Sequence, residues 1–235
     1  MSRSDSQEVI PGGAPLIERI RQEAARVPGA SRIRLALGYL FVPGLAPVWE
    51  ALETSAATEI QLLIGNTAGV LTDEQRIAAA ESAHSAASGP TRLAPELDMA
   101  AGARAERSRI IDETARALRE NLGRLPGQTA ENRRFLLGLA GAIGASRVRV
   151  RIYPDGRLHA KASLFDRVAS GESTALVGSS NLTLPATGNP TELNVLVHDP
   201  AAVGAVGDWF DSLWDVSQDF TRALFVEVSA RAAGE

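Results

Sequence analysis

Short strand-like runs separated by helical patterns are the feature that most constrains the fold of this chain. The runs at 32–41 (RIRLALGYLF) and 59–65 (EIQLLIG) are apolar and β-branched, and a helical pattern opened by Pro43 fills 44–54 between them. Strand–helix–strand units usually form parallel neighbours through a right-handed crossover. Further strands are predicted at 147–153, 158–165, 174–178 and 192–198. This order predicts an α/β fold with a mixed, largely parallel sheet flanked by helices.

A helical stretch without strand signals separates the first two predicted strands from the rest. It runs from about 72 to 144, and two of its helices are predicted at about 95–122 and 129–144. We interpret the stretch as a helical insertion that lies on the sheet or beside its active edge.

The two ends of the chain give weaker signals. Residues 1–14 are polar and contain glycine, and we expect a flexible leader there. A helix is predicted at 16–27, and a last helical region starts at Asp199–Pro200, because aspartate caps helices and proline is tolerated at the first helical position. One domain over 1–235 is the organisation that we predict.

Composition excludes several classes of function. The net charge is -4 with a pI near 5.5, so a protein that coats nucleic acid nonspecifically is not expected, and any site for a polyanion must be local. The chain has no cysteine, which excludes disulfides, thiolate nucleophiles and cysteine-based metal sites. We see no secretory signal and no membrane-spanning run, so we expect a cytoplasmic protein.

The segment GRLHAKASLFD, residues 156–166, holds the one lysine of a chain with 24 basic Lys and Arg residues. Alternate side chains on a strand share a face, so His159, Lys161 and Ser163 should point to one side. The other side should carry Leu158, Ala160, Ala162 and Leu164. The strand therefore delivers an imidazole and an ammonium side by side.

This pair of groups suits a phosphate. Lysine supplies a compact cation with three donors, whereas arginine supplies a planar fork that is aimed differently. Neutral imidazole is a nucleophile or a base near pH 7. These residues therefore indicate a phosphate site in which the imidazole is a nucleophile or a base.

The pattern His159-x-Lys161-x4-Asp166 resembles the HKD signature of the phospholipase D superfamily. Two more parts of that family's pattern follow, a Gly-Ser-x-Asn turn in GSSN (178–181) and an acidic partner in Glu192. The segments VRIYPDGRLHAKASLF, GSSNLT and WFDSLWDVSQDFT also resemble the phospholipase D-like domains at the N-terminus of bacterial superfamily-2, Swi/Snf-type helicases. No helicase motor follows here, so the chain is either a free-standing relative or one domain of a longer protein.

The resemblance implies roles for the matching residues. His159 would attack phosphorus to give a phosphohistidine, while Lys161 and Asn181 would hold the nonbridging oxygens. Glu192 would accept a hydrogen bond from the far nitrogen of the imidazole. Asp166 is expected to be structural.

Some parts of the implied machinery are less defined. Ser179 and Ser180 are supporting candidates that would add a hydroxyl or backbone donors. The superfamily uses a second histidine as the acid, but His84 and His198 lack the motif and are expected to be surface or capping residues. A homodimer that brings a second His159 to the site would supply the missing acid. No metal and no cofactor are expected, because lysine and asparagine side chains would neutralise the charge.

The substrate is predicted from charge. Arg147, Arg149 and Arg151 alternate and should share a strand face, and with Arg157 they could bind a nucleic-acid backbone. The alternative is an edge strand that its charges protect from aggregation. We expect a nuclease on DNA or RNA. The alternatives are a non-cleaving nucleic-acid-binding module of a helicase or defence assembly and, third, a phospholipase, although no membrane-binding segment is evident.

Overall fold

A computed structural model describes residues 7–29, 31–38, 42–65, 96–123, 129–154, 158–167, 172–180, 182 and 192–234. Its strands are β1 (Gln7–Pro11), β2 (Arg32–Leu37), β3 (Glu59–Gly65), β4 (Val148–Tyr153), β5 (Lys161–Phe165), β6 (Thr174–Gly178), β7 (Leu193–Val197) and β8 (Gln218–Asp219). Its helices are α1 (Ala14–Ala25), α2 (Val42–Thr54), α4 (Glu96–Gly123), α5 (Ala130–Gly144), α6 (Pro200–Val216) and α7 (Thr221–Ala233).

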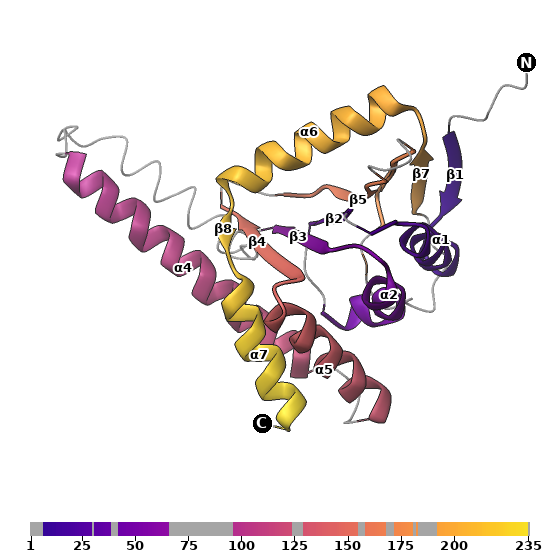
Figure 1. The fold of residues 1–235 in the computed structure, drawn as a ribbon. Helices are drawn as coiled ribbons and strands as arrows, with labels where there is room; N and C mark the ends of the chain where they lie inside the picture. The colour runs from indigo at the N-terminus through magenta and orange to yellow at the C-terminus, as the bar shows by residue number, and fades with distance from the viewer. Residues whose placement is uncertain are drawn as a thin grey trace, which may run out of the picture.

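The strands of the described residues form one sheet in the order β1-β7-β6-β5-β2-β3-β4-β8 (Figure 1). Strand β2 is parallel to β3, and β3 is parallel to β4, while the other five pairings are antiparallel. The predicted α/β fold, with a mixed sheet flanked by helices, is confirmed. The prediction that this sheet is largely parallel is wrong. One reason is that residues 166–173 between β5 and β6 are fewer than the dozen or so that a parallel crossover needs.

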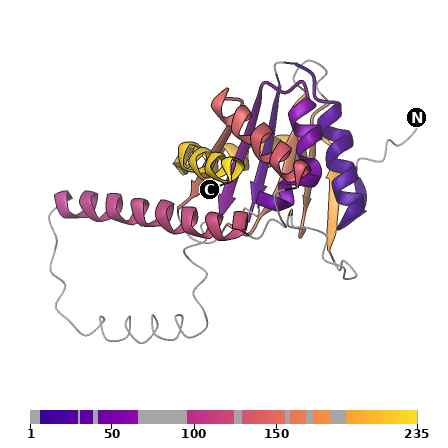
Figure 2. The same ribbon diagram turned by 90° about the horizontal axis from the view of Figure 1, so that it is seen from below.

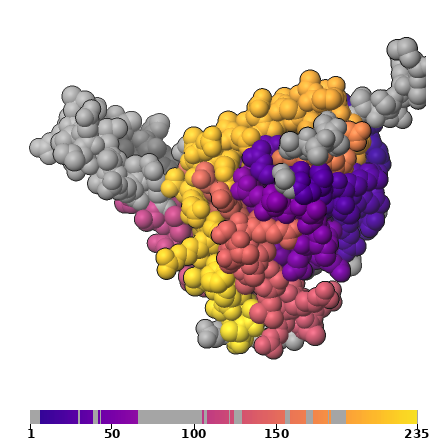
Figure 3. All heavy atoms as spheres, in the orientation of Figure 1, coloured from indigo at the N-terminus to yellow at the C-terminus, as the bar shows by residue number. Residues whose placement is uncertain are grey.

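Helices cover both faces of the sheet (Figure 1). Helix α6 packs on one face, over a small core that includes Leu164, Phe210 and Trp214. The opposite face carries α1, α2, α5 and α7 over the larger core, to which Leu139 and Leu224 belong. Figure 3 shows α2, α5, α6 and α7 at the surface of the molecule in this view. Both sheet faces are therefore occupied, and functional side chains can collect only at strand ends.

Helices α4 and α5 come between the parallel strands β3 and β4 in the sequence. Helix α5 buries Phe135, Leu136 and Leu139 in the larger core, and its N-cap Thr129 accepts a hydrogen bond from the main chain of Asn132. Helix α4 buries Ile110, Leu118 and Leu122, and it also extends outward past the sheet (Figure 2). The beginning of the predicted helical stretch, up to residue 95, lies outside the described residues.

The first residues correct one prediction. A flexible leader was expected over 1–14, but Gln7–Pro11 is strand β1 and pairs with β7 in an antiparallel register. The physical reason is that the main chain of this segment forms hydrogen bonds with the otherwise unpaired side of β7. Of its side chains, Ile10 alone is buried.

The last part of the chain agrees with the sequence at one cap and adds two elements. Asp199 accepts a hydrogen bond from the main chain of Ala202, as its predicted capping role requires. Strand β8 and helix α7 follow α6 and were not predicted separately. Among the residues that the structure describes, no helix is both long and apolar enough to span a membrane.

Candidate active site

The candidate site lies at one end of the strands, where β1, β2 and β6 end and β5 and β7 begin. Lys161 opens β5 and is in register with Leu37, at the end of β2, and with Gly178, at the end of β6. Gly178 in turn is in register with Asn194 on β7. At the end of β1, the Gly12 N–H donates to the main-chain oxygen of Glu192 at 3.0 Å. The topology thus brings the HKD strand, the turn after β6 and the start of β7 together.

Lys161 and His159 are in direct contact. The Lys161 Nζ atom lies 3.0 Å from Nε2 of His159 and donates to the main-chain oxygen of His159 at 2.7 Å. The imidazole is exposed, whereas Lys161 is only 7% exposed. An ammonium group has donors only, so a protonated Lys161 makes Nε2 the acceptor and places the ring proton on Nδ1.

The division of side chains between the two faces of this segment is as predicted. Leu158, Ala162 and Leu164 belong to the core under α6. Lys161 and Ser163 are instead in register with Leu37 and Leu35, which belong to the larger core on the opposite face. Both residues line a small cavity there, with Leu16 of α1 and part of Ala162. The predicted strand 158–165 is shorter, however, because β5 begins at Lys161.

Two glycines explain how the main chain just before β5 can cross the ends of β2 and β3. A Cβ atom on Gly65 would lie 2.3 Å from the oxygen of Gly38 and 2.8 Å from the oxygen of Leu158. A Cβ atom on Gly38 would lie 3.3 Å from Cα of His159. Glycine at the ends of β2 and β3 therefore lets the main chain of Leu158 and His159 lie directly on the two parallel strands.

Glu192 supplies the negative charge of the site. Burial lowers the pKa of Lys161, and the charge of Glu192 opposes this shift. One carboxylate oxygen of Glu192, Oε2, is buried without a hydrogen-bond partner among the described residues. The hydrogen bond from His159 to Glu192 that the resemblance implies is not among those found between described residues. Glu192 therefore acts on Lys161 by charge, and none of the described residues donates to its Oε2.

The turn after β6 is held by two side chains. Ser179 is exposed, and its Oγ accepts from the main-chain N–H of Leu193 at 3.2 Å. Ser180 is buried, and its Oγ accepts from Nδ2 of Asn194 at 2.9 Å. Asn181, the predicted partner of Lys161, lies outside the described residues.

Asn194 was not predicted from the sequence. It lies on β7, two positions after Glu192, which immediately precedes the strand. In the predicted strand 192–198, the alternation of side chains would place both on one face. This two-residue spacing is the sequence signal from which Asn194 could have been predicted. The glycines at the ends of the first two strands, Gly38 and Gly65, were a second signal, because glycine at a strand end often marks a close approach of another main chain.

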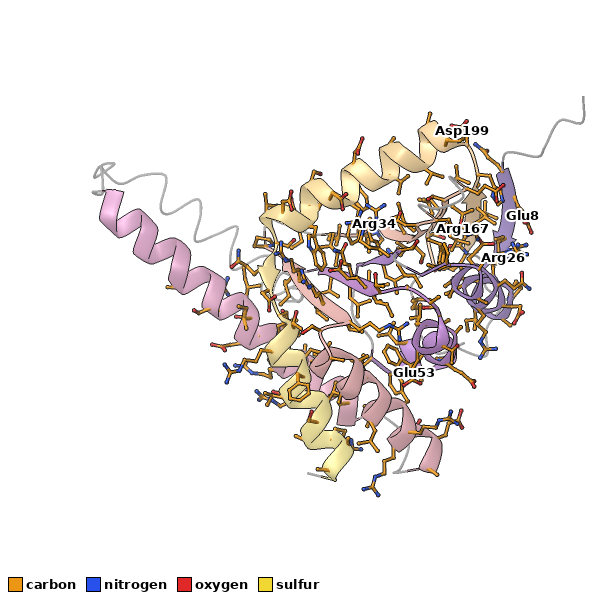
Figure 4. All side chains as sticks on the ribbon, viewed as in Figure 1. Glu8, Arg26, Arg34, Glu53, Arg167 and Asp199 are labelled. Atoms are coloured by element: carbon orange, nitrogen blue, oxygen red, sulfur yellow. The ribbon has the colours of Figure 1, made fainter. Side chains whose placement is uncertain are left out.

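Asp166 lies beyond the far end of β5 from Lys161. Its carboxylate accepts from Arg34 at 2.8 Å and is 3.5 Å from Nε of Arg32. Arg34 is buried beneath α6 (Figure 4), where it also donates to Asp211 and to the main chain of Gly207. These partners tie β2, β5 and α6 together, in keeping with the structural role that we expected for Asp166.

The arginines that were predicted to bind nucleic acid do not form a free stripe beside the site. Arg147 lies just before β4, at the end of the sheet remote from Lys161, and makes five hydrogen bonds to Leu52, Glu53, Ser55 and Ala57 at the carboxyl end of α2. Its donors are thus used inside the fold.

The remaining arginines of the set differ in their surroundings. Arg149 is 3.4 Å from Glu59 and its side chain is more than half exposed. Arg151 donates to the main-chain oxygen of Trp214 and lies over that indole ring, on the α6 face. Strand β4 pairs with β3 along its length. On its other side Arg151 and Ile152 pair with β8, and the main chain of Val150 is hydrogen-bonded to Phe220 and Thr221. Arg157 lies outside the described residues.

Among the described residues, neither the remaining histidine nor a group of metal ligands adds to the site. His198 is exposed after the end of β7, and His84 lies outside the described residues. Within the described ranges, no group of three or more His, Asp or Glu residues is placed to hold a metal ion.

Part of the chain matches a known family. Residues 125–214 match the family described as "Cardiolipin synthase, PLD-like domain". The matched segment contains His159, Lys161 and Glu192, and this part of the chain is similar to phospholipase D-like domains. A comparison with curated proteins found no matching relative. The likeness to domains attached to helicases stays a prediction.

The chain is similar to solved structures at low sequence identity. Phosphatidylserine synthase from Haemophilus influenzae superposes with a TM-score of 0.50 and 13% identity, over 94% of this chain and 42% of that chain. Nuc from Salmonella typhimurium, a phospholipase D family member, has a TM-score of 0.48 and 12% identity, over 91% of this chain and 97% of that one. NucT from Helicobacter pylori has a TM-score of 0.45 and 10% identity, over 91% and 98%. The first likeness supports a common fold.

Proposed function

We propose that this protein is a phosphodiesterase that cleaves DNA or RNA without a metal ion, as a homodimer and through a phosphohistidine at His159. The observation that carries the proposal is the contact between an exposed imidazole and a buried ammonium, 3.0 Å apart, with a carboxylate acting on the same ammonium. The proposed nucleophile His159 and the cation Lys161 lie at the start of β5, and the carboxylate of Glu192 lies at the start of β7, at the same end of the strands.

In the first step an imidazole nitrogen of His159 attacks phosphorus, and the bond from phosphorus to the leaving oxygen breaks. The leaving oxygen takes a proton from a second imidazole, so that one strand end departs as an alcohol. In the second step the same imidazole takes a proton from water, whose oxygen displaces His159 from phosphorus. The products are an alcohol and a phosphomonoester, and His159 is regenerated.

Charge develops on the nonbridging oxygens during both steps. Lys161 is the cation for these oxygens, and binding of a phosphate would replace its contact with Nε2 of His159. Asn181 is proposed as a second donor, next to Ser180, which Asn194 holds in place. Glu192 keeps Lys161 in its charged form against the effect of burial.

The second imidazole is proposed to come from a second copy of the chain. Each chain holds one HKD motif, so a twofold axis through the site would place two copies of His159 on opposite sides of one phosphate. The homodimer is therefore part of the mechanism and not an independent proposal.

Nucleic acid is the proposed substrate class because basic residues surround the HKD strand in the sequence. Arg149 presents a side chain that is 58% exposed, and Arg157 stands two residues before His159. Phosphate contacts of this kind position a nucleic-acid backbone without reading its sequence. Arg147 is no longer part of this proposal, because its donors bond to the end of α2.

The test compares the wild-type protein with His159→Ala on single- and double-stranded DNA and RNA in EDTA. Cleavage that resists EDTA and disappears in His159→Ala supports the proposal. Equal binding by the two proteins without cleavage would instead indicate a binding module, such as one in a helicase or defence assembly. Hydrolysis of phosphatidylcholine vesicles without binding of nucleic acid would indicate a phospholipase.

A further inference from the structure

Asn194 occupies a buried position directly behind the candidate site. It is 2% exposed, and its Nδ2 donates to Oγ of Ser180 at 2.9 Å and to the main-chain oxygen of Ile10 at 3.3 Å. Its Oδ1 fills the space where a Cβ atom of Gly178 would stand, 2.2 Å away. One amide thus contacts β1, the end of β6 and the turn after it.

These contacts surround the main chain of Glu192. The Gly12 N–H donates to the oxygen of Glu192, and a Cβ atom on Gly12 would lie 2.7 Å from Cβ of Glu192 and 2.9 Å from Oγ of Ser180. Gly12, at the end of β1, therefore packs against both Glu192 and Ser180. Strand β1, through Ile10, and Ser180 are both hydrogen-bonded to the Asn194 side chain.

We propose that Asn194 is a positioning residue, which holds β1 and Ser180 around Glu192 and thereby fixes the carboxylate that acts on Lys161. Its effect on turnover rests on the proposed function, whereas its effect on the charged pair does not. Nothing in the family pattern of HKD, GSSN and acidic partner assigns this asparagine a role.

A purely structural amide would behave differently from a positioning one. Loss of a buried hydrogen bond lowers stability wherever it occurs in the fold. Loss of a positioning contact also changes the electrostatic surroundings of Lys161, whose charged neighbour is Glu192 and whose hydrogen-bonded neighbour is the imidazole of His159. The two roles separate if the titration of Lys161 is measured directly.

The sequence makes this measurement simple, because Lys161 is the only lysine of the chain. Protein grown with lysine labelled at Cε with carbon-13 gives one lysine signal, which titrates with Lys161. The reference variant is Glu192→Gln, which removes the charge that raises the pKa of Lys161. The test variant is Asn194→Ala. Thr174→Val is the matched control, since it removes a buried hydrogen bond to Glu23 of 2.8 Å at the far end of β6.

Glu192→Gln should move the Lys161 midpoint to lower pH, and Asn194→Ala should move it in the same direction. Thr174→Val should leave it at the wild-type value. Ser180→Ala, a smaller change in the same contact, should act like Asn194→Ala and serves if that variant does not fold. A wild-type midpoint in Asn194→Ala and Ser180→Ala, or no shift in Glu192→Gln, would overturn the inference.

Turnover provides the second readout. On a diester that the wild type cleaves, Asn194→Ala should lower kcat about 10- to 100-fold, as substitutions of orienting partners do, with KM changed much less. Thr174→Val should keep wild-type kcat. Retention of full kcat by Asn194→Ala would contradict the inference. A wild type that cleaves no diester would refute the proposed function, but the lysine titration would still decide the role of Asn194.

Discussion

The side-chain nitrogen of Lys161 lies 3.0 Å from Nε2 of His159, although Lys161 is buried and His159 is exposed. The contact joins the cation to the group that we propose as nucleophile. It also explains why a chain so rich in arginine has lysine at this one place, because the planar guanidinium is larger and donates in a fixed fork.

Replacement of this cation by the larger one should therefore impair catalysis. Lys161→Arg keeps the charge but does not reproduce a single compact donor inside a small cavity. We expect kcat to fall on the order of 10²–10³-fold, as for loss of a donor to a developing oxyanion. Steady-state kinetics on an oligonucleotide would measure it, with Arg133→Lys at an exposed position of α5 as control. Wild-type kcat in the Lys161→Arg variant would show that lysine is not specifically required.

The titration of Lys161 in the wild type gives a pH prediction. Because burial disfavours its charged form, its midpoint in the folded protein should lie below the ordinary 10.5, and it should return to that value in urea. The folded state then binds fewer protons than the unfolded state between the two midpoints, so this group makes the protein more stable as pH rises through that window. The single lysine signal would report both midpoints, and equal midpoints in the two states would contradict the observed burial.

The close packing at the strand ends predicts a difference between two glycines. Gly65→Ala would push a methyl group into the main chain of Gly38 and Leu158, so we expect a loss of about 1–3 kcal/mol in the free energy of unfolding, with lower activity. Gly204→Ala in α6 meets no atom within 4 Å and should stabilise the protein by about 0.5–1 kcal/mol. Urea unfolding measures both. Equal stability of the two variants would show that the approach of His159 to the sheet is looser than described.

The buried ion pair between Arg34 and Asp166, at the far end of β5 from the site, predicts a second contrast. Arg34→Met leaves the buried carboxylate of Asp166 without its nearest partner, so we expect a loss of about 3–5 kcal/mol. Arg149→Ala removes an exposed pair with Glu59 and should cost about 0–1 kcal/mol. Thermal or urea unfolding tests the difference, and a loss below about 1 kcal/mol in Arg34→Met would argue that Asp166 is not held by Arg34.

The homodimer predicts a mass and a mixing effect. Light scattering should give twice the chain mass of 24.8 kDa at concentrations where the enzyme is active. If each phosphate needs two copies of His159, an excess of the His159→Ala protein should lower the activity of the wild type through mixed dimers. An active monomer, or wild-type activity that is unaffected by the excess variant, would contradict the proposed source of the second imidazole.

Local pattern was enough to predict much of the sheet but not its edges. Strands β3 and β6 have the bounds predicted from EIQLLIG and TALVG, because continuous apolar runs with clear ends define a buried strand. Strand β1 was missed, since Gln7–Pro11 buries one side chain and gains its structure from the main chain of β7, far along the sequence. Such pairing depends on tertiary context and leaves little local signal.

The site was predictable where the residues follow one another and less so where partners are distant. His159 and Lys161 stand two apart, so strand geometry alone places them together. The bonds of Arg147 to residues some 90 positions earlier have no signature in its own neighbourhood, and its alternation with Arg149 therefore misled the prediction. Asn194 was overlooked because its partners are distant in the sequence: Ser180 lies in the turn after β6 and Ile10 lies on β1.

The covalent intermediate tests the central claim most directly. Wild-type protein would react in EDTA with an oligonucleotide carrying phosphorus-32 at the cleaved linkage, and the reaction would be stopped in alkali, where phosphohistidine survives. We predict that the label is bound to the peptide containing His159 and that His159→Ala binds none. Cleavage of the same oligonucleotide without any labelled protein, or with full rate in His159→Ala, would contradict the account.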